Sequence, residues 1–530
     1  MEIHRRQFVV GPEPVLVDRG WAAREVASGT FISHCNGLPV ATVRDGNGIP
    51  WHLLGLAVQT DPQRPDPTAE IVAAGTGEVA RLYPAWAGRW VLIGNGKVHL
   101  DASGLLGVFY LPARPAAGGP RDTWLSSSAS LLAELTKSEV VPGGIERIKE
   151  GGVNWYPPPR SRYAGIRRLL PSQVLVLPGG ELRSRPLLPE PGQAEGTGGY
   201  EDVLSGLQEG LTAGLRRAAE GHRRLWVPLS AGYDSRLVLA LALHAGLNVK
   251  TYTMRKANEW RLVGNSRPRT SYVLKADMTL PPLIARQAGV EHRWIPKGPF
   301  CGSDLELFDG HTGGHTVEND RAYFSHGQWG WLEPGDLILR GGVFEVGHCF
   351  YWKRFPGKYA PGALPAPDEV IDAFELPGDS LHARAIREWL AWAAEAPVAD
   401  IDWRDRMYIE QRVAGWLSSL EQALDLVAGE RFYPLNAGRF FRLLTSIPEQ
   451  KRLAKTHHVD LIARTAPDLL RFPFNPPEPA ARRLVFRALV HWDRVRSLPL
   501  SSVVPYLAGG LRRHRQASTN AGAKKNSSGA

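Results

Sequence analysis

The sequence predicts a chain of two parts, an α+β part rich in strands followed by an α/β part built on a parallel sheet. Up to about residue 190, short apolar runs alternate with turn residues, which is typical of strands. Within 225–254, a strand, a loop, a helix and a second strand follow one another, and such a βαβ unit implies a parallel sheet. Residues 188–200 are rich in proline and glycine and predict a linker between the two parts.

Composition limits the class of protein. The 530 residues are enough for two or more domains, and 43% hydrophobic with 22% charged residues is ordinary for a globular protein. No apolar run reaches about 18 residues and the N-terminus lacks a secretory signal, so we expect no membrane span and a cytoplasmic protein. Cys35, Cys301 and Cys349 form no C-x-x-C pair, which favours a reducing compartment without a structural zinc site.

Two hairpins are the clearest elements of the first part. Residues 89–101 hold two strands around Asn95-Gly96, a dipeptide that favours a type I′ turn. Residues 173–182 repeat the pattern around Gly179-Gly180. Further strands, each a short apolar run, are predicted at 8–10, 39–43, 51–58 and 105–110.

The second part begins with a helix and then the βαβ unit. Apolar residues recur at helical spacing over 200–220, which predicts an amphipathic helix. The apolar run 225–229 predicts a strand, and the apolar run after Ser235 predicts a helix that ends near Gly246. Residues 248–254 are β-branched and aromatic, and predict the next strand.

The loop between this strand and helix has the parts of a phosphate site. Its small residues let backbone N–H groups approach an anion, and a helix that begins at Ser235 adds unpaired donors and the positive end of its dipole. Ser230 and Ser235 offer hydroxyls, and Asp234 offers a ligand for Mg²⁺. An ordinary strand-to-helix turn with Asp234 as the helix N-cap would give the same spacing.

The order Ser-Ala-Gly-Tyr-Asp-Ser at 230–235 resembles the Ser-Gly-Gly-x-Asp-Ser pyrophosphate loop of the asparagine-synthetase-like ATP pyrophosphatases. The family includes asparagine synthetases, β-lactam synthetases and lasso-peptide cyclases. Its members transfer AMP from ATP to a carboxylate, release pyrophosphate, and let an amine displace AMP to form an amide. Here Ala231 replaces the first glycine and Arg236 replaces a small hydroxyl residue.

This resemblance implies an α/β parallel-sheet ATP-pyrophosphatase domain, of the adenine nucleotide α-hydrolase-like fold, with ATP and Mg²⁺ as cofactors. The loop residues that would bind pyrophosphate and Mg²⁺ are Ser230, Gly232, Asp234 and Ser235. The backbones of Leu229 and Met254 would contact the adenine.

The first part resembles the N-terminal glutaminase domain of asparagine synthetases. Three short matches occur in the family's order, at Gly88-Arg89-Trp90, at Asp101-Ala102-Ser103-Gly104 and at Phe109-Tyr110. They imply an Ntn-hydrolase-like sandwich for residues 1–190.

One departure bears on activity. A glutaminase of this class needs cysteine as its first residue after removal of Met, so that its own amine activates the thiol. Residue 2 is Glu2, and Cys35 stands beside His34 on a predicted strand, where neighbours point to opposite faces. We therefore predict a degenerate domain that makes no ammonia and serves as a scaffold or a docking platform.

A second loop, after a predicted strand at 336–340, resembles the family's Ser-Gly-[Glu/Asp]-Gly-Ala-Asp-Glu loop. In that register Gly341 matches the glycine that approaches the nucleotide, and Glu345 matches the acid that holds Mg²⁺. Gly342 stands where asparagine synthetases place an acid that reads aspartate, which argues against asparagine synthesis. The alternative for Glu345 is a solvated loop acid.

A third segment resembles the end of the family's synthetase domain. Residues 432–436 resemble a Pro-Phe-Leu-Asp turn with Asn436 for Asp, and Ile447-Pro448 resembles the closing Leu-Pro. The resemblance implies that Lys455 is the catalytic cation, and the alternative is a surface lysine. Asp277 matches an acid near the nucleotide, or is a plain helix N-terminal acid. The pair His311 and His315 suggests a metal, but the intervening glycines and the lack of a third ligand argue against one.

These patterns predict an ATP-dependent carbon–nitrogen ligase that forms an amide from a small-molecule or peptide carboxylate and an amine. Ring closure in peptide or natural-product biosynthesis is attractive because the glutaminase cysteine is missing. An amidotransferase that uses external ammonia and a non-catalytic nucleotide-binding scaffold remain as alternatives. The predicted domains are 1–190, 191–505 and a disordered basic tail at 506–530, with no specific nucleic-acid partner.

Overall fold

The computed structural model describes residues 4–474, apart from the segments 28, 113–114, 117–118, 121–122, 143–152, 154, 178, 190–197, 255–275, 296–305, 308–309, 314–330, 358, 361 and 399–400. Glu2, Cys301, His315 and the predicted tail at 506–530 therefore lie outside the described residues. Among the described residues, no helix is both long and apolar enough to cross a bilayer.

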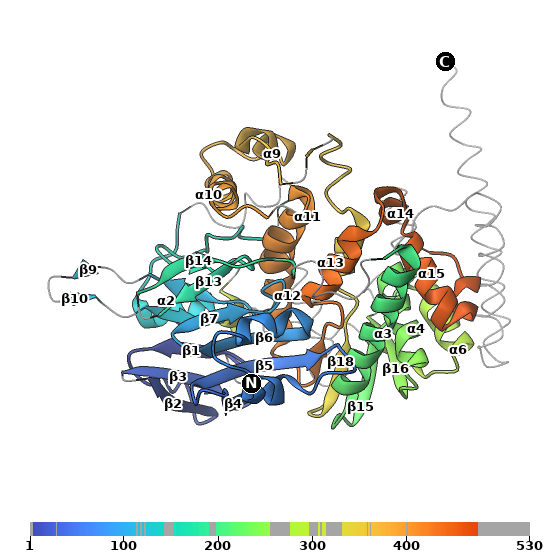
Figure 1. Cartoon of the computed structure of the whole chain (residues 1–530), viewed down its shortest axis with the longest axis horizontal. Helices are drawn as coiled ribbons and strands as arrows, with labels where there is room; N and C mark the ends of the chain where they lie inside the picture. The colour runs from blue at the N-terminus through green and yellow to red at the C-terminus, as the bar shows by residue number, and fades with distance from the viewer. Residues whose placement is uncertain are drawn as a thin grey trace, which may run out of the picture.

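The N-terminal part contains two six-stranded antiparallel sheets packed face to face (Figure 1). The first sheet has the order β12-β8-β11-β1-β3-β2, with strands Phe8–Gly11 (β1), Trp21–Ala27 (β2), Thr30–Cys35 (β3), Phe109–Leu111 (β8), Trp124–Ser126 (β11) and Arg167–Arg168 (β12). The second has the order β14-β13-β7-β6-β5-β4, with strands Val40–Arg44 (β4), Pro50–Gln59 (β5), Trp86–Gly94 (β6), Lys97–Leu100 (β7), Gln173–Val176 (β13) and Glu181–Ser184 (β14). Alternate residues of both sheets, such as Phe8 and Val91, form the apolar core between them.

Both predicted hairpins are confirmed. β6 and β7 pair around Asn95 and Gly96, whose φ angles of 48° and 66° are those of a type I′ turn. β13 and β14 pair around Gly180. Short helices flank the sheets, at Pro67–Ala73 (α1), Val79–Arg81 (η1), Tyr83–Ala85 (η2) and Ala129–Thr136 (α2), and a small hairpin joins Pro115–Ala116 (β9) to Gly119–Pro120 (β10).

The C-terminal part contains the predicted parallel sheet. Its five strands have the order β17-β16-β15-β18-β19, and every neighbouring pair is parallel. They are Arg224–Pro228 (β15), Val249–Met254 (β16), His292–Ile295 (β17), Asp336–Leu339 (β18) and Glu430–Phe432 (β19). The strand order reverses between β15 and β18. Open α/β sheets bind their ligands in the crevice at the carboxyl ends of the strands at such a switch point.

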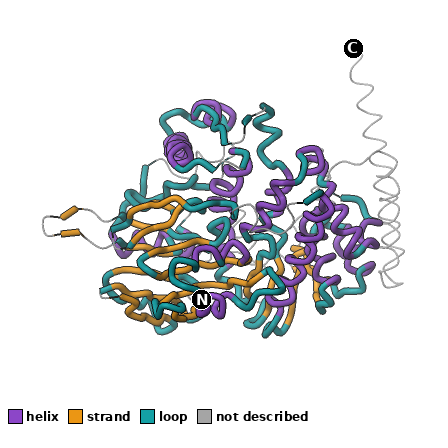
Figure 2. Tube along the Cα trace, in the orientation of Figure 1, coloured by secondary structure: helices purple, strands orange, loops and turns teal. Residues whose placement is uncertain are grey.

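Helices surround this sheet and extend beyond it (Figure 2). They are Tyr200–Ala219 (α3), Tyr233–His244 (α4), Leu280–Gln287 (α6), Phe344–His348 (η5), Pro367–Ala373 (α9), Leu381–Glu395 (α10), Gly438–Ser446 (α13), Glu449–Ala454 (α14), Thr456–Thr465 (α15) and Pro467–Arg471 (η7). The predicted helix at 200–220 is confirmed, and its periodic apolar residues, including Leu207 and Leu211, are buried.

A long helical segment lies at the boundary between the two parts. It consists of Trp403–Met407 (α11), a π-helical stretch Tyr408–Leu417 (η6) and Ser418–Leu424 (α12). Its Ser418 hydroxyl donates to the Leu105 carbonyl of the sandwich, at 2.9 Å. Asn436, just after β19, donates to the Gly88 carbonyl and to Asp101 Oδ1, at 2.6 and 2.9 Å. The asparagine that replaces the motif's aspartate thus joins the two parts.

Candidate functional site

The loop after β15 lies at the crevice and turns directly into α4. The helix begins at Tyr233, two residues before the predicted start at Ser235, and its N-cap is Gly232. Asp234 is therefore in the first helical turn and is not the N-cap, which removes the simplest structural explanation for its presence. Burial of α4 residues such as Leu237 and Leu241 in the main core fixes the direction in which this first turn faces.

Side chains close this loop into a compact turn. The Ser230 and Ser235 hydroxyls lie 2.9 Å apart, and Ser235 Oγ accepts the Ser230 N–H at 3.0 Å. The Gly232 N–H donates to Ser230 Oγ at 3.1 Å, and the Ala231 N–H donates to Asp277 Oδ1 at 3.0 Å. The structure thus places Asp277 against the loop, as expected of an acid near a nucleotide site.

The pKa of Asp234 is strongly shifted from its ordinary value. Burial raises its pKa to about 7, and the Lys455 ammonium opposes this rise only in part. Its Oδ1 is buried without a hydrogen bond of ordinary geometry, although His348 Nε2 and His458 Nε2 lie 3.3 and 3.1 Å away. A buried carboxylate oxygen that lacks a donor is costly in a folded protein and suits a bound cation.

Glu345 is turned inward beside Asp234. It belongs to η5, at the end of the loop after β18, and its Oε2 accepts a hydrogen bond from the Tyr408 hydroxyl at 2.7 Å. Burial raises its pKa, and the charge of Asp234 adds to the rise. Two carboxylates, one from α4 and one from η5, therefore lie close enough for the charge of one to affect the pKa of the other.

Lys455 completes this group from a third segment. It lies between α14 and α15 with a φ of 58°, and its Nζ is 4.7 Å from the centre of the Tyr233 ring. Burial lowers its pKa, while the charges of Asp234 and Glu345 counteract that effect. The structure thus brings Lys455 together with both predicted magnesium ligands.

Buried arginines hold these three segments in place. Arg452 in α14 donates to the Val346 carbonyl and to Asp405 Oδ2. Arg236, which replaces a small residue of the resembled motif, is fully buried. Its guanidinium donates to the carbonyls of Ala231, Phe472 and Pro473, and so ties the loop to the chain that follows η7.

The loop after β18 lies directly against the first loop. A Cβ at Gly341 would lie 3.0 Å from the Asp234 carbonyl carbon and from the Ser235 nitrogen, so a larger residue would require the two loops to move apart. A Cβ at Gly342 would lie 2.7 Å from the Tyr433 ring, so this ring occupies the space that an aspartate-reading acid would need. Val343 has a φ of 77°, at the place where the resembled motif has its second glycine.

The two predicted adenine contacts lie at the carboxyl ends of their strands. The Leu229 N–H donates to the Tyr252 carbonyl at 2.8 Å, and its carbonyl accepts from Thr253 Oγ1 at 2.6 Å. Met254 is half-buried against Trp226 and its neighbours. Both polar backbone groups of Leu229 are therefore used within the sheet, and the adenine contacts stay predictions.

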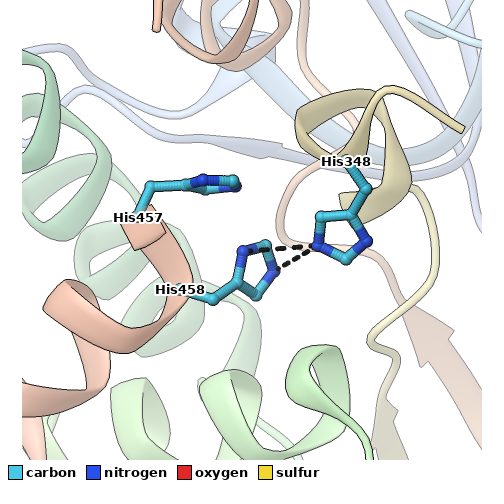
Figure 3. A group of neighbouring side chains, drawn as sticks. All are labelled: His348, His457 and His458. Atoms are coloured by element: carbon cyan, nitrogen blue, oxygen red, sulfur yellow. Dashed lines mark hydrogen bonds between the residues drawn. The ribbon is translucent and has the colours of Figure 1, made fainter. Parts of the chain in front are cut away.

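Three histidines beside Asp234 were not predicted (Figure 3). His348 ends η5, while His457 and His458 begin α15, and their ring nitrogens lie within 4.8 Å of one another. Burial lowers the pKa of His457 to about 2 and of His458 to about 3. The dipeptide two residues after Lys455 was the available signal in the sequence, but its partner His348 is more than 100 residues away.

The histidine pair that the sequence did single out behaves as expected of structural residues. His311 Nδ1 accepts the His4 N–H at 3.0 Å, its Nε2 lies 2.8 Å from the Gln422 carbonyl, and the ring is fully buried. His315 lies outside the described residues. Cys35 likewise belongs to a small apolar core with Val9 and Trp21.

Comparison with known proteins gives no family. No protein-family model matches this chain, and no curated protein matches it. The conclusions on function therefore depend on the residues and geometry described above.

Proposed function

We propose that this protein is an ATP-dependent ligase that adenylates a carboxylate, with release of pyrophosphate, and joins it to an amine. The observation that carries this proposal is the convergence of Asp234, Glu345 and Lys455 at the crevice between β15 and β18. These residues come from three distant segments, and each was expected from the resemblance to the asparagine-synthetase-like family.

The side chains fit a magnesium ion. The oxygen Oδ1 of Asp234 lacks a hydrogen-bond donor, and the charge of Asp234 raises the pKa of Glu345. Hard carboxylate oxygens are the ligands that Mg²⁺ uses, together with substrate phosphates. When bound, Mg²⁺ would offset the negative charge of the phosphates.

The remaining residues would bind and orient the substrates. The N–H groups of residues 230–232 are used within the protein, so the donors to pyrophosphate would be the backbone N–H groups in the first turn of α4. The Lys455 ammonium would stabilise the negative charge that develops as AMP is transferred and as it leaves. The amine would come from the substrate itself or from free ammonia, and the sandwich would serve as a scaffold.

The test is ATP–pyrophosphate exchange by the purified full chain with pools of candidate carboxylic acids and Mg²⁺. We expect exchange that depends on one acid and is lost in Asp234→Asn. The matched control is Asp468→Asn, because that side chain is 60% exposed and lies on η7 of the same part.

A negative exchange assay is followed by calorimetric titration with ATP and Mg²⁺. Binding that Asp234→Asn abolishes, without exchange under any acid pool, would replace the ligase with a nucleotide-binding scaffold. No binding of ATP would exclude both functions.

A further inference from the structure

We propose that His348, His457, His458 and Asp234 form a binding site for a divalent transition metal of the zinc class. These side chains come from η5, from the start of α15 and from the first turn of α4. The site goes beyond the proposed ligase function, although it shares Asp234 with it.

The distances among three of the donor atoms match a metal site. His348 Nε2 and His458 Nε2 are 3.2 Å apart, and they lie 3.3 and 3.1 Å from Asp234 Oδ1. A tetrahedral ion with bonds of about 2.0–2.1 Å holds its ligand atoms about 3.3 Å apart. The three atoms therefore form a triangle of the size of one tetrahedral face.

His457 is the remaining candidate donor, and one of its ring nitrogens lies within 4.8 Å of those of His348 and His458. Its ring is fully buried, and neither of its nitrogens makes a hydrogen bond of ordinary geometry, although the Lys451 carbonyl lies near it. An imidazole without a partner is unfavourable in a protein interior. Figure 3 shows its ring beside those of His348 and His458, so that the three rings gather around one space.

The backbone leaves little freedom for His457 to move away. A Cβ at Gly347 would lie 2.7 Å from His457 Nε2, so glycine at 347 makes room for this ring beside η5. The missing hydrogen bonds concern both ring nitrogens of His457, and the close approach concerns Nε2.

The donor set selects the class of metal. Three imidazole nitrogens and one carboxylate oxygen suit Zn²⁺ and related first-row ions, whereas Mg²⁺ prefers oxygen ligands. Within the described residues, no thiolate joins the group. The site is therefore distinct in chemistry from a magnesium site made by Asp234 and Glu345.

The experiment measures metal binding by the full chain without nucleotide. Chelator-treated protein is dialysed against Co²⁺ or Zn²⁺, the bound metal is counted, and Co²⁺ is followed by its visible absorption. We expect one equivalent of metal and the intense visible bands of tetrahedral Co²⁺. The variants His348→Ala and His458→Ala should each weaken binding roughly 10-fold or more, since even loss of a residue behind a ligand costs 10- to 100-fold.

The control is His244→Ala, because His244 ends α4 and contacts Gln208 on the surface. It should bind metal as the parent does, and circular dichroism of all metal-free variants should show that they fold. Octahedral Co²⁺ spectra, binding that is equal in His348→Ala and the parent, or no binding by the parent would each overturn the proposal.

The same variants separate this site from the ligase proposal. If both are right, Zn²⁺ inhibits ATP–pyrophosphate exchange by occupying Asp234, and His348→Gln requires roughly 10-fold more Zn²⁺ for the same inhibition. Metal binding without any exchange leaves the metal site intact and counts only against the ligase.

Discussion

Two groups of buried charged residues in this protein differ in one respect, the pairing of their acids. At the boundary between the two parts, Arg89 on β6 binds Asp425 at 2.9 and 3.2 Å, and Arg431 binds both Asp425 and Glu421. Arg340 binds Glu421 at 2.9 Å. Each acid of this boundary cluster faces two arginines, which together hold its pKa below the usual value.

At the crevice the acids lack such arginine partners within the part of the chain that the structure describes. Among the described residues, neither Asp234 nor Glu345 has an arginine within ion-pair distance, and the pKa of both is raised. The Lys455 ammonium opposes the rise of the Asp234 pKa, the charge of Arg412 opposes that of Glu345, and the pKa of Lys455 is itself lowered. A fully paired cluster joins parts of a fold, whereas under-paired acids in a crevice are typical of a site that awaits a cation or substrate.

The largest effect is expected for Asp425→Ala, which tests whether the paired acids of the boundary cluster stabilise the fold. Removing this acid leaves Arg89 buried without its ion-pair partner and leaves Arg431 with Glu421 alone, and loss of one member of a buried pair costs about 3–5 kcal/mol. We expect urea denaturation to show that loss in the free energy of unfolding. A loss below about 1 kcal/mol would mean that the cluster is solvated or rearranges.

Lys455→Met tests the other cluster by its activity. We expect exchange to fall about 100- to 1000-fold, as for other preorganised groups that stabilise charge in the transition state. Stability should change little, because Lys455 is only partly buried. Lys451→Met is the control, since Lys451 lies four residues earlier and faces the Tyr200 ring, 3.8 Å away. Equal rates in the two variants would remove Lys455 from the mechanism.

The pH dependence of stability should have opposite signs in the two clusters. The pKa of Asp234 is raised from 3.8 to about 7, so the folded state binds more protons than the unfolded state between these values. Its contribution to stability is therefore fully present below pH 3.8 and is lost as the pH rises to about 7. The lowered pKa of Asp425 gives stability above its unfolded value that is lost as the pH falls.

Asp234→Asn should remove the decrease in stability with rising pH that Asp234 causes. Without metal, the free energy of unfolding of the parent should fall by about 1–3 kcal/mol between pH 5 and pH 7, and the variant should fall less. Urea denaturation at both pH values measures this. Parallel pH profiles for the two proteins would show that Asp234 is solvated in the folded state.

Asn436→Asp is the mildest test, and it restores the aspartate of the resembled turn. The new carboxylate cannot donate to the Gly88 carbonyl and stands beside Asp101 Oδ1. We expect a loss of about 1–3 kcal/mol, because buried acceptors are left without their donor. Asn436→Ser as a comparison keeps a donor without adding charge. A variant as stable as the parent would show that the two parts do not depend on this amide.

Local patterns were enough to predict several elements of this fold, although the strand predicted at 105–110 begins only at Phe109, as β8. The helix α3 followed from the spacing of Leu207 and Leu211, and the β6–β7 turn followed from Asn95-Gly96, because these signals act between near neighbours. The start of α4 was wrong by two residues, since Gly232 rather than a side-chain acceptor caps it.

The candidate site could be predicted only where a motif covered it. Asp234, Glu345 and Lys455 came from the resemblance, and the structure brings them together. His348 carried no local signal, because its partners His457 and His458 lie on a helix more than 100 residues away. The sequence also carried no sign that the Tyr433 ring fills the space beside Gly342, because the two residues are far apart along the chain.

The contact at Gly341 gives the crevice a mechanical property. Because a Cβ on Gly341 would lie 3.0 Å from the Asp234 carbonyl carbon and from the Ser235 nitrogen, the loops after β15 and β18 pack backbone against backbone. The segment that leads into η5 and the first turn of α4, which carries Asp234, are therefore mechanically coupled. We expect a ligand that displaces one of them to shift the other.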